Sequence, residues 1–294
     1  MSGALAEAAA GVRRLRRAEF PELLREIHDP PRVLYLRGAG DVELLARPAV
    51  AIVGARACSP YGSQVARMLG RELAAAGLVV VSGLARGVDG EAHRGVLEAG
   101  GVTVAVLGCG IDRDYPAAHA DLARRICERG LVVSEYEPGV EPAPWRFPAR
   151  NRIIAGLAAA TVIVEARERS GALITADFAL EDGREVFAVP GEITGSLATG
   201  TNRLLRQGAT PLTSAADVLD VFGLGVVRAP QPLALGETAT RVLERLAESW
   251  ATADELARAT GLEAGPLSAA LAELELAGLV GEADGRYRGV RPPN

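Results

Sequence analysis

The chain has 294 residues, a length that favours one large domain with a small one, or two domains. Hydrophobic residues make up 49% of it and charged residues 23%, which is typical of a globular chain and excludes a disordered one. The formal net charge of -5 excludes polyanion binding through an overall basic field, so a polyanionic ligand needs a local cluster of cations.

The first 48 residues are too few to bury a core of their own. They contain a segment of helical character at Glu19–Ile27, followed by a proline-containing run from Asp29 to Tyr35. We interpret residues 1–48 as a short lead-in that packs on a sheet formed by the residues after it. One extra strand within the lead-in is an open alternative.

Residues 49–222 repeat one pattern, in which a short β-branched run precedes a glycine-rich turn and a helical segment. Each run is continuously apolar, as a strand buried on both faces of a sheet requires. Strand, turn and helix in alternation predict an α/β fold with a doubly wound, mostly parallel sheet. The predicted strands are the runs at 50–53, 79–81, 102–107, 131–133, 161–164 and 186–189.

Residues 223–236 contain two prolines, three glycines and one charged residue, which is typical of a linker. Residues 237–292 then show three helical segments and a hairpin pattern around Ala283-Asp284-Gly285. Three helices and a hairpin within about 55 residues are the winged-helix pattern. The predicted helices span 237–247, 252–260 and 265–277.

This small C-terminal domain is acidic, because residues 236–294 hold 6 arginines against 10 acidic residues. Its third helical segment, which in a winged helix enters a DNA groove, has no arginine and two glutamates. The charge therefore favours a protein-contact module over a DNA reader, although DNA reading remains the alternative.

In a doubly wound sheet, ligands bind beyond the carboxyl ends of the strands, so the loops after each predicted strand form the candidate site. All 32 basic residues of the chain are arginine, which excludes a Schiff base or a P-loop lysine there. Glycine-rich loops, helix N-termini and guanidinium groups are together suited to phosphate. We predict a phosphate-rich ligand along this edge, held by Gly54, Arg56, Ser82, Gly83, Arg86, Arg150, Asn151, Arg152, Ser170, Gly171 and Thr175.

The same loops lack a recognisable catalytic set. The three histidines, His28, His93 and His119, belong to no Ser–His–Asp order, and no GxGxxG follows the first predicted strand. Glu165 at a strand end is the best candidate acid or base, and a rim carboxylate that pairs with an arginine is its simpler interpretation. We therefore predict no catalytic residue and no enzymatic activity.

Cysteine usage indicates a reducing compartment. The chain has three cysteines without CxxC spacing, which predicts neither a disulfide framework nor a metal site. The N-terminal residues lack the apolar core of a signal peptide, and no run of 18 apolar residues occurs. We expect a cytoplasmic protein with no cofactor and no membrane partner.

A series of motifs closely resembles the DprA/Smf family of DNA-processing proteins over about residues 29–222. In chain order these are VAIVGAR, SGLARGVDGEAH, VAVLGCGIDRDYP, SEYEPG, FPARNRIIAGL, VIVEA, SGALITADFALEDGR, VFAVPG and GTNRLLRQGA. The resemblance implies an extended Rossmann-like domain that binds single-stranded DNA and protects it during natural transformation. It also implies loading of the RecA recombinase and a homodimer, for which the apolar run at 219–222 is a candidate interface. The C-terminal domain resembles the winged-helix domain of some family members.

The family motifs assign roles to particular residues. The resemblance matches Gly54-Ala55-Arg56 to a GSR-type loop, with alanine here in place of the hydroxyl residue. It makes Arg86, in the intact SGLARG loop, the first candidate for a phosphate clamp. It gives Phe147 the role of a base-stacking ring, for which a core anchor is the alternative.

Two other functions stay open. Phosphoribohydrolases, which release bases from nucleoside monophosphates, share a related fold, but residues 170–177 lack the paired glycines and the glutamate of their PGGxGTxxE loop. A winged-helix transcription factor with a ligand-sensing core is the second, and the arginine-free third helix opposes it.

Overall fold

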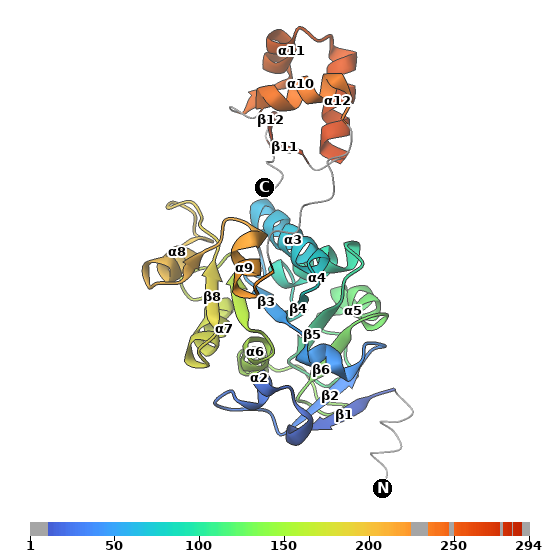
Figure 1. Ribbon diagram of the computed structural model, residues 1–294, viewed down its shortest axis with the longest axis vertical. Coiled ribbons are helices and arrows are strands. Elements are labelled where there is room, and N and C mark those ends of the chain that lie inside the picture. Colours follow the sequence, from blue (N-terminus) through green and yellow to red (C-terminus); the bar gives the residue numbers. More distant parts are fainter. Residues whose placement is uncertain (1–10, 225–234, 247–249, 277–278, 284, 290–294) are drawn as a thin grey trace. The chain divides into compact units, whose positions relative to one another are not determined.

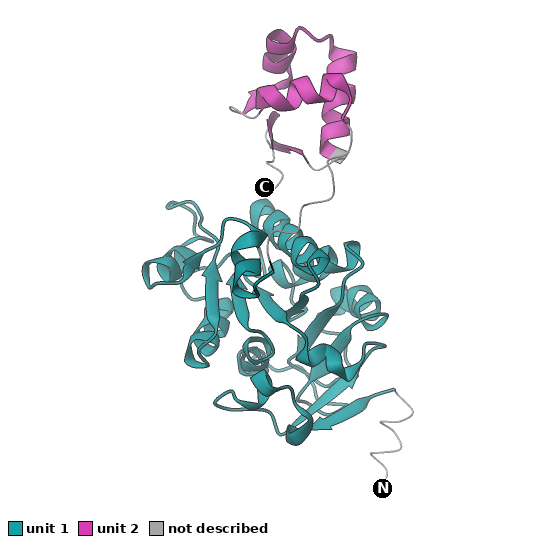
Figure 2. Cartoon of the chain, in the orientation of Figure 1, with its two compact units in different colours: residues 1–226 teal, residues 227–294 magenta. Residues whose placement is uncertain are grey.

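The computed structural model describes residues 11–224, 235–246, 250–276, 279–283 and 285–289 (Figure 1). The chain forms two compact units: unit 1 spans residues 1–226 and unit 2 spans residues 227–294 (Figure 2). Most of the predicted linker lies outside the described residues, as do the predicted helix ends at Ala247 and Ala277 and the turn residue Asp284.

Six parallel strands form the centre of unit 1, in the order β6-β5-β4-β3-β7-β8. Nearly all their side chains are buried, because helices cover both faces of the sheet. The predicted doubly wound, mostly parallel sheet is therefore confirmed. The strands are β3 (Ala49–Val53), β4 (Val79–Ser82), β5 (Thr103–Leu107), β6 (Leu131–Ser134), β7 (Ala160–Ile163) and β8 (Glu185–Ala188).

Three further strands extend the sheet. Two of them come from the lead-in: β2 (Val33–Arg37) pairs antiparallel with β6, and β1 (Arg13–Arg16) pairs antiparallel with β2. The lead-in thus contributes two strands within the sheet, where the sequence suggested at most one. The alternation in β1 was hidden because Leu15 is its single apolar residue. At the opposite edge, β9 (Thr210–Pro211) pairs parallel with β8.

The helices divide between the two faces of this sheet (Figure 1). One face carries α3 (Pro60–Ala75), α4 (Val88–Glu98), α5 (Ala120–Cys127) and α9 (Ala215–Val221). The other face carries α2 (Glu22–Arg25), α6 (Arg146–Gly156), α7 (Gly171–Glu181) and α8 (Thr199–Arg206). The helix expected over residues 19–27 is only the four-residue α2, which starts after Pro21.

β3 and β7 are neighbours in the sheet, but the helices that follow them pack on opposite faces. The chain leaves β3 towards α3 on one face, and it leaves β7 towards α7 on the other. The two loops therefore diverge at the carboxyl edge, which is the topological switch point where ligands bind in such folds.

Unit 2 has the elements of a winged helix. Its helices are α10 (Glu237–Leu246), α11 (Ala253–Thr260) and α12 (Ala264–Leu276), and its sheet has the order β10-β12-β11. These strands are β10 (Ala251–Thr252), β11 (Val280–Ala283) and β12 (Arg286–Gly289). Across both units, no helix in the described residues has the length and apolarity to cross a membrane.

His93 is a fully buried residue of α4 and is held in one tautomer. The Thr103 hydroxyl donates to the Val80 carbonyl over 2.6 Å, so it accepts a hydrogen bond from Nδ1 of His93 over 2.8 Å. Nε2 of His93 has no hydrogen-bond partner in the described part of the chain, and a proton there would be desolvated. Burial, with nearby cations, lowers the pKa of His93 from 6.5 to about 3.

This lowered pKa predicts acid sensitivity. The unfolded chain takes up a proton on His93 below pH 6.5 and the folded chain does not until about pH 3, so stability falls as the pH drops through that interval. The loss from this one residue is at most about 1.4 kcal/mol for each pH unit. We expect His93→Asn, which keeps an N–H donor near Thr103, to show a shallower loss in urea unfolding between pH 6.5 and 4. The exposed His28→Asn is the control, and equal slopes in both variants would contradict this role of His93.

Candidate functional site

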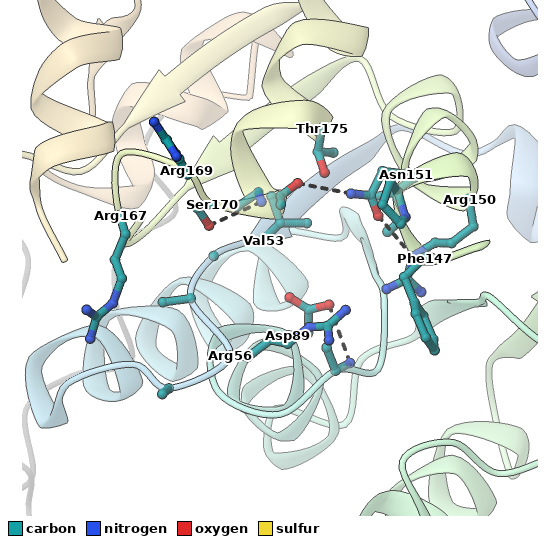
Figure 3. Close-up of a pocket in the computed structure, with 18 residues that line it drawn as sticks. Val53, Arg56, Asp89, Phe147, Arg150, Asn151, Arg167, Arg169, Ser170 and Thr175 are labelled. Atoms are coloured by element: carbon teal, nitrogen blue, oxygen red, sulfur yellow. Dashed lines mark hydrogen bonds between the residues drawn. The ribbon is translucent and has the colours of Figure 1, made fainter. Parts of the chain in front are cut away.

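A pocket of about 360 Å³ lies at the switch point (Figure 3). Residues from the loops that follow β3, β4 and β7, and from α4, α6 and α7, form its walls. Eight of the predicted site residues line it: Gly54, Arg56, Phe147, Arg150, Asn151, Ser170, Gly171 and Thr175.

Arginines dominate the charge of this pocket. Arg56 comes from the β3 loop, Arg150 from α6, and Arg167 and Arg169 from the β7 loop, so three elements contribute them (Figure 3). Asp89 is the one carboxylate among the described residues that line the pocket. The side chains of Arg56, Arg167 and Arg169 are exposed. An excess of guanidinium groups in a partly enclosed hollow attracts anions despite the acidic net charge of the chain.

The N-terminus of α7 opens on the same pocket. Ser170 caps this helix by accepting a hydrogen bond from Ala172 N over 3.3 Å. Gly171 is exposed, and a Cβ added there would meet no atom within 4 Å, so the start of α7 is open to a ligand. The backbone N–H groups of this first turn carry the positive end of the helix dipole, which favours a bound anion.

The N-terminus of α3, by contrast, is already occupied by Glu165. The carboxylate accepts hydrogen bonds from Ser59 N over 2.8 Å and from Ser59 Oγ over 2.5 Å. A Cβ on Gly62 would lie 2.3 Å from Oε2 of Glu165, which explains the glycine in the first turn of α3. The sequence suggested either an acid–base role or an arginine partner for Glu165. Its partners are instead Ser59 and the helix end.

Arg150 is 4% exposed and is held inside the site. It donates to the carbonyls of Gly83, over 2.8 Å, and of Val106, and its Nε donates to Oδ1 of Asn151 over 3.0 Å. Burial lowers the pKa of Arg150 to about 10, against the attraction of Asp89. Burial also raises the pKa of Asp89, against the attraction of Arg150 and hydrogen bonds from backbone amides. Arg150 therefore joins the carboxyl ends of β4 and β5 to α6, and most of its donors are used within the protein.

Asn151 and Phe147 occupy the next positions on α6. Nδ2 of Asn151 donates to the Gly171 carbonyl over 3.1 Å, which couples α6 to the start of α7. The half-buried Phe147 ring stacks on Tyr115, with centroids 5.2 Å apart and planes inclined by 27°. The Arg56 guanidinium carbon lies 5.3 Å from the Phe147 centroid. Phe147 belongs to none of the hydrophobic core clusters, so its position favours a surface ring over a core anchor.

Four predicted site residues do not line this pocket: Ser82, Gly83, Arg86 and Arg152. Ser82 is fully buried, and its hydroxyl donates to the Ile52 carbonyl over 2.6 Å, tying β4 to β3. Gly83 has no room for a side chain, because a Cβ would lie 2.1 Å from Arg150. Arg86 is exposed on the loop between β4 and α4 at the same edge of the sheet.

Arg152 lies apart from the pocket. It donates to both carboxylate oxygens of Glu135, over 2.8 and 2.7 Å, and to Asp29 over 3.0 Å. It lines a different hollow, next to residues 29–33, and its charge is neutralised there. The sequence placed it at the site because it is near Arg150 in the chain. On α6, however, residues two apart point in different directions.

Comparisons with known proteins agree with this architecture. The family model described as DNA recombination-mediator protein A matches residues 12–223, and the DprA winged helix domain model matches residues 227–286. The chain belongs to the DprA family. Its C-terminal unit is the family's winged-helix domain, as the sequence pattern predicted.

Individual DprA proteins are similar over most of the chain. DNA processing protein DprA of Streptococcus pneumoniae strain R6 is 46% identical over 203 residues, covering 69% of this chain and 71% of that protein. The putative DNA processing protein DprA of Mycobacterium tuberculosis strain H37Rv is 44% identical over 269 residues, covering 89% of this chain and 69% of that protein.

Two solved DprA structures share the fold. DprA from Streptococcus pneumoniae matches with a TM-score of 0.68 and 43% identity, covering 73% of this chain and 77% of that one. DprA from Helicobacter pylori matches with a TM-score of 0.65 and 33% identity, covering 72% and 95%. The Helicobacter structure describes the single-stranded DNA binding mode of that protein.

Sequence reasoning missed Arg167 and Arg169 in this DprA chain. They lie in the segment Ala166–Ser170, which follows the fifth predicted strand just as Gly54–Arg56 follows the first. The rule that ligands bind at the carboxyl ends of strands applied equally to both arginines. The predicted site residues Phe147, Arg150, Asn151 and Arg152 all lie on the helix α6.

The bonds of Arg150 predict a structural effect. Arg150→Met leaves Asp89 buried without its cation and leaves the Gly83 and Val106 carbonyls without this donor. Removing the cation near a buried carboxylate, together with the donor to two buried carbonyls, costs about 3 kcal/mol of unfolding free energy. Chemical unfolding should show a loss of this size for Arg150→Met. The exposed Arg125→Met on α5 should differ from the parent by less than about 0.5 kcal/mol, and similar losses in both would refute a special role for Arg150.

Proposed function

We propose that this DprA chain is a cytoplasmic, non-catalytic protein that binds single-stranded DNA in the pocket between β3 and β7. The observation that carries the proposal is the convergence of exposed arginines and the accessible α7 N-terminus beside the half-buried Phe147 ring. Phosphate groups need the first two features, and an unpaired base needs the third. The single-stranded DNA binding mode described for the Helicobacter pylori relative supports the same ligand class.

Each group has a distinct part in the proposed contact. Arg56, Arg167 and Arg169 contact phosphates, together with the N–H groups at the start of α7. A base stacks near Phe147, whose ring is held by Tyr115. Ala55 supplies no hydroxyl to the β3 loop, so guanidinium and amide groups provide the phosphate contacts there. None of these interactions depends on base identity, and the binding is therefore tolerant of sequence.

Anisotropy with a labelled oligo-dT tests this function. Arg56→Ala, Arg167→Ala and Arg86→Ala should each weaken binding by about 1–3 kcal/mol if the residue makes a charged hydrogen bond to phosphate. Arg125→Ala, near the C-terminal end of α5 and outside the pocket, is the matched control and should bind like the parent. The three losses should shrink as salt is raised, because each residue contacts a phosphate.

The competitors decide between outcomes. A matched duplex and AMP should displace the oligonucleotide poorly. No single-strand binding, or displacement by micromolar AMP, would reject the proposal and favour a mononucleotide pocket. Parent-like affinity in Arg86→Ala alone would remove that loop residue from the binding surface and leave the pocket assignment intact.

We also propose that the chain helps to load RecA on the bound strand and acts as a homodimer. The recombination-mediator description of the matching family supports the first part. For the second, the candidate interface at residues 219–222 includes Val221, an apolar side chain of α9 that is 43% exposed. A bound strand held mainly through its phosphates leaves bases available to a recombinase.

RecA-dependent ATP hydrolysis measures the loading. On single-stranded DNA precoated with a single-strand-binding protein, the parent chain should shorten the lag before hydrolysis begins. Arg56→Ala should lose this effect in proportion to its lost DNA affinity, and Arg125→Ala should keep it. An unchanged lag with the parent chain would contradict the loading role while leaving DNA binding in place.

A further inference from the structure

Beside the first turn of α6 lies a second group of aromatic and cationic side chains, Tyr136, Trp145 and Arg146, which we name the outer cluster. The Arg146 guanidinium carbon lies 4.7 Å from the Trp145 ring centroid and 5.0 Å from that of Tyr136. Arg146 also donates through one terminal nitrogen to the Glu141 carbonyl. One guanidinium group therefore braces two rings and is itself fixed by the backbone.

The fold gives no packing reason for Trp145. Its side chain is 63% exposed, and it belongs to none of the hydrophobic core clusters. It stands at the N-cap position of α6 without making a side-chain capping bond. A large ring that remains mostly in water, held in place by a cation, has the properties of a stacking surface.

The outer cluster is continuous with the pocket described above. Phe147 and Pro148, which line that pocket, directly follow Trp145 and Arg146 in the chain. Tyr136 and Arg146 line the neighbouring hollow of about 440 Å³, the one that also contains Arg152. The first turn of α6 thus presents Phe147 towards one hollow and Arg146 towards the other.

The charges around the outer cluster indicate which part of a nucleotide it can bind. In the neighbouring hollow, Asp29 and Glu135 are paired with Arg152, while Glu137 has no ion pair within the described residues. Arg32 and Arg146 also line that hollow, so its acidic and basic side chains balance and the hollow as a whole has no excess of cations. The Trp145 ring, by contrast, offers a π-face that any unpaired base can use, and Arg146 is positioned to contact the phosphate attached to that base.

We propose that Trp145 and Arg146 form an outer nucleotide subsite, where a base of single-stranded DNA stacks on Trp145 after the strand leaves the pocket at Phe147. The subsite rests on the proposed function, since it holds the continuation of the same strand. It lengthens the binding site without adding preference for any base. Strands that fill only the pocket do not reach it.

Intrinsic fluorescence reports on this subsite directly. The chain has two tryptophans, so Trp250→Phe in the full chain leaves Trp145 as the single emitter. Addition of unlabelled oligo-dT of about 15 nucleotides should quench its emission, because the base stacks on the indole. Unchanged emission under conditions where anisotropy reports saturated binding would overturn the subsite and leave the proposed function standing.

A length series separates the two sites energetically. Trp145→Ala should weaken binding of a 15-nucleotide oligo-dT by about tenfold, within the range for one stacked base, and should leave binding of a trinucleotide unchanged. Trp145→Phe should restore most of the loss. The matched control is Trp250→Ala, because Trp250 is also exposed, at 42%, and has the Arg288 guanidinium 4.9 Å from its ring centroid.

Each remaining outcome is decisive. Equal losses in Trp145→Ala and Trp250→Ala, or equal losses at both oligonucleotide lengths, would reject an outer subsite on α6. Absence of binding in the parent, with Arg56→Ala indistinguishable from it, would reject the proposed function together with the subsite.

Discussion

The architecture of the site depends on one buried cation. Arg150 reaches from α6 to the ends of β4 and β5, where it donates hydrogen bonds to the Gly83 and Val106 carbonyls. Burying a guanidinium is unfavourable unless it is paired and hydrogen-bonded, so the arrangement of Asp89, Gly83 and Asn151 around it is constrained as a unit. Gly83 in particular must lack a side chain for Arg150 to pass. A buried charge thus fixes the frame, and exposed charges on that frame are left for a ligand.

The N-termini of α3 and α7 both carry the positive end of a helix dipole at the switch point, but only that of α3 is paired with a carboxylate. At α3 the positive helix end is neutralised internally by Glu165, which stabilises the β3–α3 turn. At α7 the equivalent end carries only the neutral cap Ser170 and remains accessible. The open α7 end lines the pocket beside Arg167 and Arg169, whereas Glu165 and Ser59 at the α3 end do not line it.

Much of the fold was predictable, because the six central strands are continuously apolar and each is followed by a glycine-rich turn. The edge strands were not, since β1 has one buried side chain and β9 has two residues. The strand-end rule predicted Arg56, Ser170 and Thr175, and these three residues line the pocket. It could not distinguish Arg150, which is turned inwards, from Arg152, which pairs with Glu135, because that distinction depends on the rotation of α6. Burial of Ser82 was likewise a tertiary effect, set by its bond to Ile52.

The pocket's cations are all guanidinium groups, in a chain that contains no lysine. Guanidinium groups stay protonated at physiological pH, so the positive potential of the pocket does not titrate there. They also offer no primary amine for acetylation or for other acyl-transfer modification. Control of ligand occupancy by lysine modification is thereby closed to this chain, and covalent control at the pocket is left to its arginine and hydroxyl side chains.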